Sequence, residues 1–383
     1  MSPIRYNALV GRVRRTRRLG HRDDTSPRPI SPHGAFRERA LPRTSILAIS
    51  RVVIMAAFAL IVLPPFPSTR AQEIFEEKSD VIPEQVEKMY VKGLQYLQKS
   101  QGSNGSWTDP AGGDAYGNNP AVVGLAVLSM LAHGDDPNTG PYSETIRHGL
   151  DFILTNMDPS TGYIGNSMYN HGFSTLALAE SYGVVNDPRI GPALKQAVAC
   201  ILTSQAGNPM GAWRYSPQSR DADTTVSGAQ LVALFAARNA GMAVPEEAIQ
   251  KALKFFIACQ TPEGGFGYTG PNGPNAPRSA IGTLMLALSR EKKTESFRRA
   301  VRYMGNPQLD NSYYHYYLYY ASQALFQASY PAWQEWNGVN IKTLATAQEP
   351  DGSWNGQLGK TFSTATSLLS LALNYRFLPI YER

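Results

Sequence analysis

A short phrase of residues recurs along this chain of 383 residues at intervals of about 45 to 55 residues. Each copy starts with a basic and a small residue, continues with an aromatic and aliphatic run, and ends on a glutamine followed by Gly-x-Trp or a close variant. Self-similarity at this period indicates a repeat architecture in which one structural unit stacks on the next. Clear copies occupy residues 92–107, 195–213, 251–268 and 344–354, and weaker copies occupy 148–163 and 299–303.

A second apolar segment follows each copy after a loop rich in Gly, Pro and Asn. These segments carry almost no charge and predict buried inner helices, whereas the phrases keep charged residues on one face and predict outer amphipathic helices. No run alternates with period two, so no strand is predicted. Six outer and six inner helices predict an all-α fold, an (α/α)6 toroid over residues 82–383. The predicted inner helices lie at residues 120–131, 172–182, 226–240, 280–288, 313–326 and 363–374.

The phrase resembles the QW motif of the squalene cyclase and prenyltransferase repeat superfamily, and the resemblance covers nearly all of residues 82–377. It implies a terpenoid cyclase-like α/α toroid in which the Gln and the Trp tie one outer helix to its neighbour. These residues serve the fold, so the resemblance specifies the fold more than an activity. Full squalene cyclases have two toroids in one chain, and this chain has one.

The positive charge of the chain lies at its N-terminus. The formal net charge is +6, but residues 1–51 alone contribute +9, and the chain from residue 72 onward carries about −4. Nucleic-acid binding by the folded part is therefore not predicted. Residues 52–66 form a short apolar run after a basic flank, which is the layout of a secretory signal. We expect residues 1–71 to be a basic leader with a signal peptide, residues 72–81 to be a linker, and the protein to be exported to the periplasm or outside the cell; an uncleaved anchor at residues 52–66 is the alternative.

The two cysteines, Cys200 and Cys259, both lie in apolar helical patterns. This placement favours buried free thiols, with a disulfide as the alternative in an oxidising compartment. The sequence has no closely spaced Cys/His set. The zinc-dependent prenyltransferases of the resembled superfamily need a Cys before an inner helix, and this sequence has none there. No metal and no cofactor are predicted.

The inner helices of such a toroid run parallel, so their N-termini converge on one mouth of the central cavity. At one of these N-termini, residues 221–226 read Asp-Ala-Asp-Thr-Thr-Val and resemble the Asp-x-Asp-Asp-Thr-Ala motif of squalene-hopene cyclases. The resemblance implies that Asp223, with Asp221 beside it, protonates a terminal alkene, although Thr224 replaces the last Asp of the motif. Capping of the helix by Asp and Thr explains the same residues without chemistry, and ligand binding is a third interpretation.

Tyr313, Tyr316, Tyr317 and Tyr320 share one helical face, at i, i+3, i+4 and i+7. Aromatic faces that point into a cavity could shield a carbocation, as the resemblance implies. They could equally stack on sugar rings or pack in the core.

Tyr169 and His171 suggest a different chemistry, because Tyr, His, Asn and Arg together serve (α/α)6 polysaccharide lyases. In that interpretation His171 is the base and Tyr169 the acid, and a structural, hydrogen-bonded His171 is the alternative. The other candidate ligand-binding residues at the predicted mouth are Tyr116, Asn119, Arg278 and His315.

Three functions remain open from the sequence. The leading one is an exported protein that binds a hydrophobic or isoprenoid ligand in its central cavity, with terpene cyclase or mutase-like isomerase turnover if it is an enzyme. The second is a polysaccharide lyase or hydrolase, and the third is a non-catalytic binding or scaffold toroid. We expect a small hydrophobic ligand or a polysaccharide as the partner, with peripheral membrane contact as a further expectation.

Overall fold

The computed structural model describes residues 82–107, 116–305 and 313–381. These residues form twelve α-helices and two short 3-10 helices, and no strand occurs among them. The predicted all-α fold is confirmed. The predictions for the leader at 1–71, the apolar run at 52–66 and the linker at 72–81 lie outside the described residues. Within the described ranges no helix is both long and apolar enough to cross a membrane.

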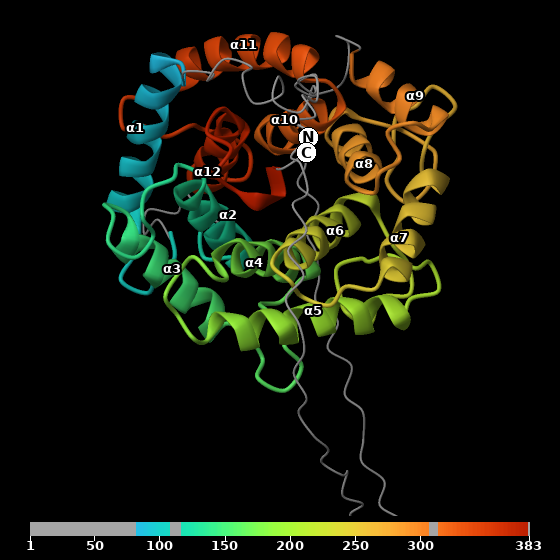
Figure 1. The fold of residues 1–383 in the computed structure, drawn as a ribbon, viewed down its shortest axis with the longest axis horizontal. Coiled ribbons are helices and arrows are strands. Elements are labelled where there is room, and N and C mark those ends of the chain that lie inside the picture. Colours follow the sequence, from blue (N-terminus) through green and yellow to red (C-terminus); the bar gives the residue numbers. More distant parts are fainter. Residues whose placement is uncertain (1–81, 108–115, 306–312, 382–383) are drawn as a thin grey trace, which may run out of the picture. The chain divides into compact units, whose positions relative to one another are not determined.

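Six helices form an inner ring, and six surround it (Figure 1). Around the inner ring each helix packs against the next, and α12 contacts α2, so the ring is closed. The (α/α)6 toroid predicted from the repeats is confirmed. The inner helices are α2 (Pro120–Leu131), α4 (Met168–Ser181), α6 (Thr224–Asn239), α8 (Ala276–Leu288), α10 (Tyr314–Ala328) and α12 (Lys360–Leu371). The outer helices are α1 (Glu84–Ser100), α3 (Ser143–Thr155), α5 (Ile190–Ala206), α7 (Glu246–Ala258), α9 (Glu295–Met304) and α11 (Tyr330–Ala347).

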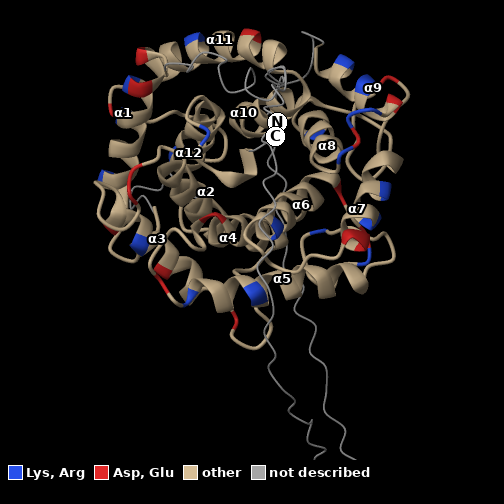
Figure 2. Ribbon diagram, viewed as in Figure 1, with Lys and Arg blue, Asp and Glu red and all other residues tan. Residues whose placement is uncertain are grey.

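The distribution of charge decides which helices are inside. All twelve residues of α2 are buried, and none of them is charged. In Figure 2 the charged residues lie mainly on the outer helices and the loops, while the inner ring is largely uncharged. A helix that is apolar all round is stable only when it is buried on every side. The ring provides this burial, because each inner helix is covered by two inner neighbours and by outer helices.

The Gln and Trp of the recurring phrase tie neighbouring repeats together. The Trp213 indole donates to the Ile201 carbonyl of its own outer helix at 2.9 Å. The Gln205 amide donates to the carbonyls of Gly211 in its own loop and Ala248 in the next outer helix, both at 2.8 Å. Equivalent pairs of amide hydrogen bonds are made by Gln101, Gln260 and Gln348.

The amide of Gln348 closes the ring. It donates to the Met89 carbonyl in α1 at 2.9 Å, which joins the last outer helix to the first across 259 positions of sequence. It also donates to the Gly352 carbonyl of its own loop at 2.9 Å. The first and last repeats are thus joined by the same glutamine contact that joins neighbouring repeats.

The C-terminal segment packs against the C-terminal ends of inner helices. Leu378, Ile380 and Tyr381 are buried there, and the Asn239 amide at the end of α6 donates to the Pro379 carbonyl. The opposite, N-terminal ends of the inner helices have no such cover from this segment.

We expect Gln348→Ala to lower the free energy of unfolding by about 1–3 kcal/mol, because the substitution removes both amide hydrogen bonds and leaves their carbonyls without this donor. Urea denaturation followed by circular dichroism measures the change. Gln334→Ala, on the exposed side of α11, the helix that ends just before Gln348, is the control and should stay within about 0.5 kcal/mol of the unmodified protein. Equal destabilisation by the two substitutions would contradict a closing role for Gln348.

Candidate functional site

A cavity of about 700 Å³ lies where the N-terminal ends of the six inner helices converge. Its lining draws residues from every inner helix or from the loop just before it. This convergence was expected from the parallel run of the inner helices. The lining residues are Tyr116, Asn119, Ala121, Val122, Asn166, Ser167, Tyr169, Asn170, Phe173, Tyr215, Thr225, Tyr268, Asn275, Pro277, Arg278, Tyr313, Tyr316, Leu358 and Phe362.

Half of the twelve site residues named from the sequence line this cavity. They are Tyr116, Asn119, Tyr169, Arg278, Tyr313 and Tyr316. The other six lie outside the lining, and they are Asp221, Asp223, His171, His315, Tyr317 and Tyr320. Helix α4 begins at Met168, four residues before the expected start, so Tyr169 and His171 belong to its first turn.

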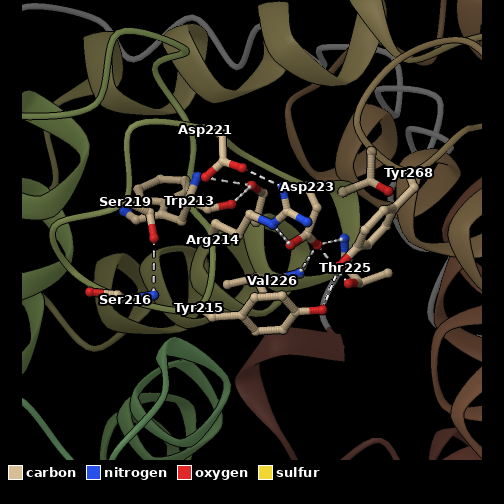
Figure 3. A network of polar contacts seen from close by, with 12 residues as sticks. Trp213, Arg214, Tyr215, Ser216, Ser219, Asp221, Asp223, Thr225, Val226 and Tyr268 are labelled. Atoms are coloured by element: carbon tan, nitrogen blue, oxygen red, sulfur yellow. Dashed lines mark hydrogen bonds and ion pairs between the residues drawn. The ribbon is translucent and has the colours of Figure 1, made fainter. Parts of the chain in front are cut away.

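Asp223 is the N-cap of α6 (Figure 3). Its Oδ1 accepts hydrogen bonds from the backbone N–H groups of Thr225 at 2.9 Å and Val226 at 2.8 Å. The side chain is completely buried, and desolvation raises the pKa of the carboxyl above its ordinary value despite these hydrogen bonds. The structure therefore gives Asp223 the capping geometry, with its carboxyl behind the cavity wall.

Asp221 lies on the surface and pairs with Arg214. The Arg214 guanidinium also lies 3.7 Å from Oδ2 of Asp223 and 5.4 Å from the centre of the Tyr268 ring. The Tyr268 hydroxyl in turn contacts that of Tyr215 at 2.5 Å (Figure 3). Arg214 thus links both acids of the motif to two tyrosines of the cavity rim.

A chain of three side chains connects Asp223 to the cavity. The Tyr169 hydroxyl donates to Oγ1 of Thr225, and Oγ1 of Thr225 donates to Oδ1 of Asp223 at 2.6 Å. Burial is the main cause that raises the pKa of the Tyr169 phenol, followed by the charge of Asp223. Of these three residues Tyr169 and Thr225 line the cavity, so the carboxylate acts on it only through them.

His171 is fully buried, and both ring nitrogens contact backbone groups. Nδ1 accepts from the Ile164 N–H at 3.1 Å, which leaves Nε2 to donate to the Ala197 carbonyl of α5 at 3.0 Å. In three other repeats a hydroxyl accepts the equivalent loop N–H, and the acceptors are Ser227, Ser279 and Thr364.

The second repeat explains why a histidine takes this position. Met157 pairs with Ile164 as Gln260 pairs with Phe266, so a methionine stands where the other repeats place the bridging glutamine. In this repeat the bond from His171 to the Ala197 carbonyl is a side-chain bond to the next outer helix, at a different carbonyl from the one the glutamines use. This geometry supports the structural interpretation of His171, and the weak second copy of the phrase was the sequence signal for it.

The remaining aromatic and histidine candidates have other surroundings. His315 contacts Oγ of Ser367 and the Asn355 carbonyl, each at 2.9 Å. Tyr317 is half-buried beside Trp336 of the outer helix α11. Tyr320 is fully buried and packs edge-on against Tyr316 with ring centres 5.1 Å apart.

Aromatic rings close the centre of the inner ring below the cavity. Phe173 of α4 meets Tyr319 of α10 with ring centres 6.0 Å apart, and Tyr316 lies 6.2 Å from Phe362 of α12. The cavity therefore has an aromatic floor. Phe173, Phe362, Tyr215 and Tyr268 were missed by the sequence interpretation. Phe173 lies a turn inside α4, Phe362 lies in the first turn of α12, and Tyr215 and Tyr268 lie in loops without periodicity.

Polar side chains of the lining include Asn275 and Arg278 at the N-terminal end of α8. Among the described lining residues Arg278 is the one with a formal charge, and its guanidinium donates to Oδ1 of Asn275 at 2.9 Å and to the Gly273 carbonyl at 2.6 Å. Among the described residues no group of His, Cys, Asp and Glu is placed to hold a metal ion. Cys200 and Cys259 are free thiols, and burial raises their pKa values to about 11 and about 12.

Comparison with known proteins gives structural neighbours only. No protein-family model matches the chain, and no curated protein matches its sequence. The type II terpene cyclase MstE from Scytonema is similar at 17% identity and a TM-score of 0.52 over 77% of this chain and all of that one. The GH76A α-1,6-mannanase from Salegentibacter sp. HEL1_6 is similar at 11% identity and a TM-score of 0.57 over 75% of this chain and 98% of that one.

A third neighbour is a D-mannose isomerase, at 13% identity and a TM-score of 0.56 over 77% of this chain and 98% of that one. All three share the α/α toroid, and identities this low establish the fold alone. The terpenoid cyclase-like toroid is thus supported, and the same fold also serves carbohydrate enzymes.

We expect the stability of the protein to fall, relative to that of His171→Ser, as the pH drops from 6.5 toward 4. Burial lowers the pKa of His171 from 6.5 to about 4, so the unfolded chain binds a proton in this window that the folded chain does not. The loss should reach about 3 kcal/mol at the lower end. Urea denaturation of both proteins at each pH measures it, and parallel stability curves would contradict the assignment. Serine keeps an acceptor for the loop N–H, as in other repeats.

Proposed function

We propose that the protein binds a hydrophobic ligand of the isoprenoid class in the cavity at the N-terminal ends of its inner helices. The observation that carries this proposal is the composition of the lining. Its floor consists of Phe173, Phe362 and Tyr316, with Ala121, Val122, Pro277 and Leu358 beside them. A mostly apolar wall with a few placed polar groups is the usual character of a small-molecule site.

The size and polarity of the cavity fit one amphiphilic molecule. Its volume of about 700 Å³ lies within the range of roughly 300–1,000 Å³ that is common for small-molecule pockets. Arg278 and Asn275 supply polar groups at the N-terminal end of α8, and Phe173 and Phe362 supply aromatic rings. A ligand would therefore place its apolar chain against the aromatic rings and its polar end against polar side chains of the lining.

The geometry supports binding better than cyclase turnover. Protonation of an alkene needs a protonated acid that faces the substrate, and Asp223 does not line the cavity. Oδ1 of Asp223 already accepts two backbone N–H groups and the Thr225 hydroxyl. Terpene cyclase or mutase-like turnover would need a rearranged Asp223.

The carbohydrate-enzyme alternative has less support from the same lining. Most glycoside hydrolases use two carboxyl groups beside the scissile bond. The described lining contains no Asp or Glu. A lyase base at His171 would need an accessible ring nitrogen, and both of its nitrogens are engaged with backbone groups.

We expect purified protein to bind geranylgeraniol, and Ala121→Phe to weaken this binding at least tenfold, because the new ring would occupy the cavity. Displacement of an apolar fluorescent probe measures the dissociation constants. Ala332→Phe, on the exposed start of α11, is the matched control and should leave binding unchanged. The proposal fails if the unmodified protein does not bind this ligand, or if both variants bind it equally well.

We further propose that the protein is exported, on the basis of the basic leader and the apolar run at residues 52–66. In a bacterial host the full chain should reach the exported fraction with a new N-terminus near residue 72, and deletion of residues 52–66 should retain it in the cytoplasm. Fractionation and mass spectrometry of the N-terminus measure both. A full-length chain in the membrane fraction would instead support the anchor, and a cytoplasmic full chain would contradict export.

A further inference from the structure

The hydrogen-bond chain behind the cavity has a fixed direction. Oδ1 of Asp223 receives the N–H groups of Thr225 and Val226, so this oxygen acts as an acceptor. The Thr225 hydroxyl must then donate its one proton to Oδ1, and it must accept from Tyr169. The proton of the Tyr169 phenol is thereby committed to Thr225. What Tyr169 offers to the cavity is an oxygen lone pair.

A second phenol lies next to this acceptor. Tyr316 is 9% exposed and lines the same cavity. Its hydroxyl lies near those of Tyr169 and Tyr320, but it makes no hydrogen bond of acceptable geometry with either of them or with another group in the described part of the chain. A buried hydroxyl without a partner costs free energy until something satisfies it. Tyr316 therefore has a proton to donate to a bound molecule.

We propose that Tyr169 and Tyr316 form a subsite for a hydroxyl group of the ligand. The ligand hydroxyl would donate to the Tyr169 oxygen and accept from Tyr316. This inference rests on the proposed binding of an isoprenoid, and it names the ligand class as an isoprenoid alcohol. A hydrocarbon of the same shape would leave both phenols unsatisfied, and an ether could accept from Tyr316 but could not donate to Tyr169.

Charge and packing around the subsite agree with a neutral hydroxyl. Asp223 places its carboxylate at the far end of the hydrogen-bond chain, which disfavours an anion beside Tyr169. The Tyr169 ring lies parallel to that of Phe173 at 6.5 Å, and the Tyr316 ring meets Phe362. The apolar body of the alcohol would lie against these rings. Thr225 and Asp223 act as positioning residues, because the Thr225 hydroxyl is engaged by Tyr169 and Asp223, and Asp223 does not line the cavity.

The test compares geranylgeraniol with its methyl ether and with the hydrocarbon of the same carbon skeleton, by probe displacement on the full-length protein. We expect the unmodified protein to bind the alcohol about tenfold more tightly than the ether, which is the effect of one hydrogen bond. In Tyr169→Phe and in Thr225→Val this ratio should fall to near one. Thr225→Ser keeps the hydroxyl and should restore it.

Matched controls separate recognition from folding. Tyr317→Phe, on the same helix as Tyr316 but outside the lining, should keep the tenfold ratio. Tyr316→Phe provides a second route if Tyr169→Phe does not fold, and it should weaken binding of both alcohol and ether. Thermal unfolding of each variant checks that it is folded.

Each outcome supports or overturns the inference. Equal affinity of the unmodified protein for alcohol, ether and hydrocarbon would overturn the hydroxyl subsite while the proposed isoprenoid binding stands. A tenfold preference that survives in both Tyr169→Phe and Thr225→Val would also overturn it, because the preference would come from elsewhere. Failure to bind any of the three ligands would overturn both proposals.

Discussion

The side-chain amide that bridges one repeat to the next is the contact on which the rest of the structure depends. A stack of helical hairpins can extend without limit, and it closes only if its last repeat can bind its first. Gln348 makes that bond to Met89 with the geometry that Gln205 uses within the array. Where the second repeat lacks the glutamine, His171 instead bonds to the Ala197 carbonyl of the next outer helix. Closure in turn buries the uncharged inner helices on all sides.

The cavity is a consequence of this closure. Parallel inner helices bring six N-terminal ends to one mouth, and the aromatic contact of Phe173 with Tyr319 closes the centre below them. The loops that carry the bridging residues also deliver Tyr215 and Tyr268 to the rim. The same short segments that hold the repeats together therefore shape the site. Sequence changes in these loops can alter which ligand is bound while the ring is retained.

Most of the fold was predictable, and about half of the site. The periodicity of apolar residues, the distribution of charge and the recurring phrase predicted the six hairpins, because each repeat has its own pattern of buried and exposed positions. Tyr169 and Arg278 could be placed at the mouth because they begin inner helices. The role of Asp223 could not be predicted, because an aspartate at the start of a helix can serve either as a cap or as a catalytic acid.

The four tyrosines at the start of α10 also show what could and could not be predicted from the sequence. Tyr313, Tyr316, Tyr317 and Tyr320 were grouped by spacing alone. The structure turns Tyr313 and Tyr316 to the cavity, buries Tyr320 beneath them and leaves Tyr317 beside the outer helix α11. Spacing defines a shared face, but the tilt and depth of the helix in the ring decide what each position on that face meets.

The sequence by itself determined the toroid, the order of its helices and the end at which a site could form, because burial pattern and helix direction are local properties repeated six times. Only the tertiary structure decided that Asp223 acts through Thr225 and Tyr169, and that Tyr316 joins them from another repeat. The physical reason is that hydrogen-bond direction and burial depend on atoms that residues far apart in the chain bring together, and no local pattern carries that information.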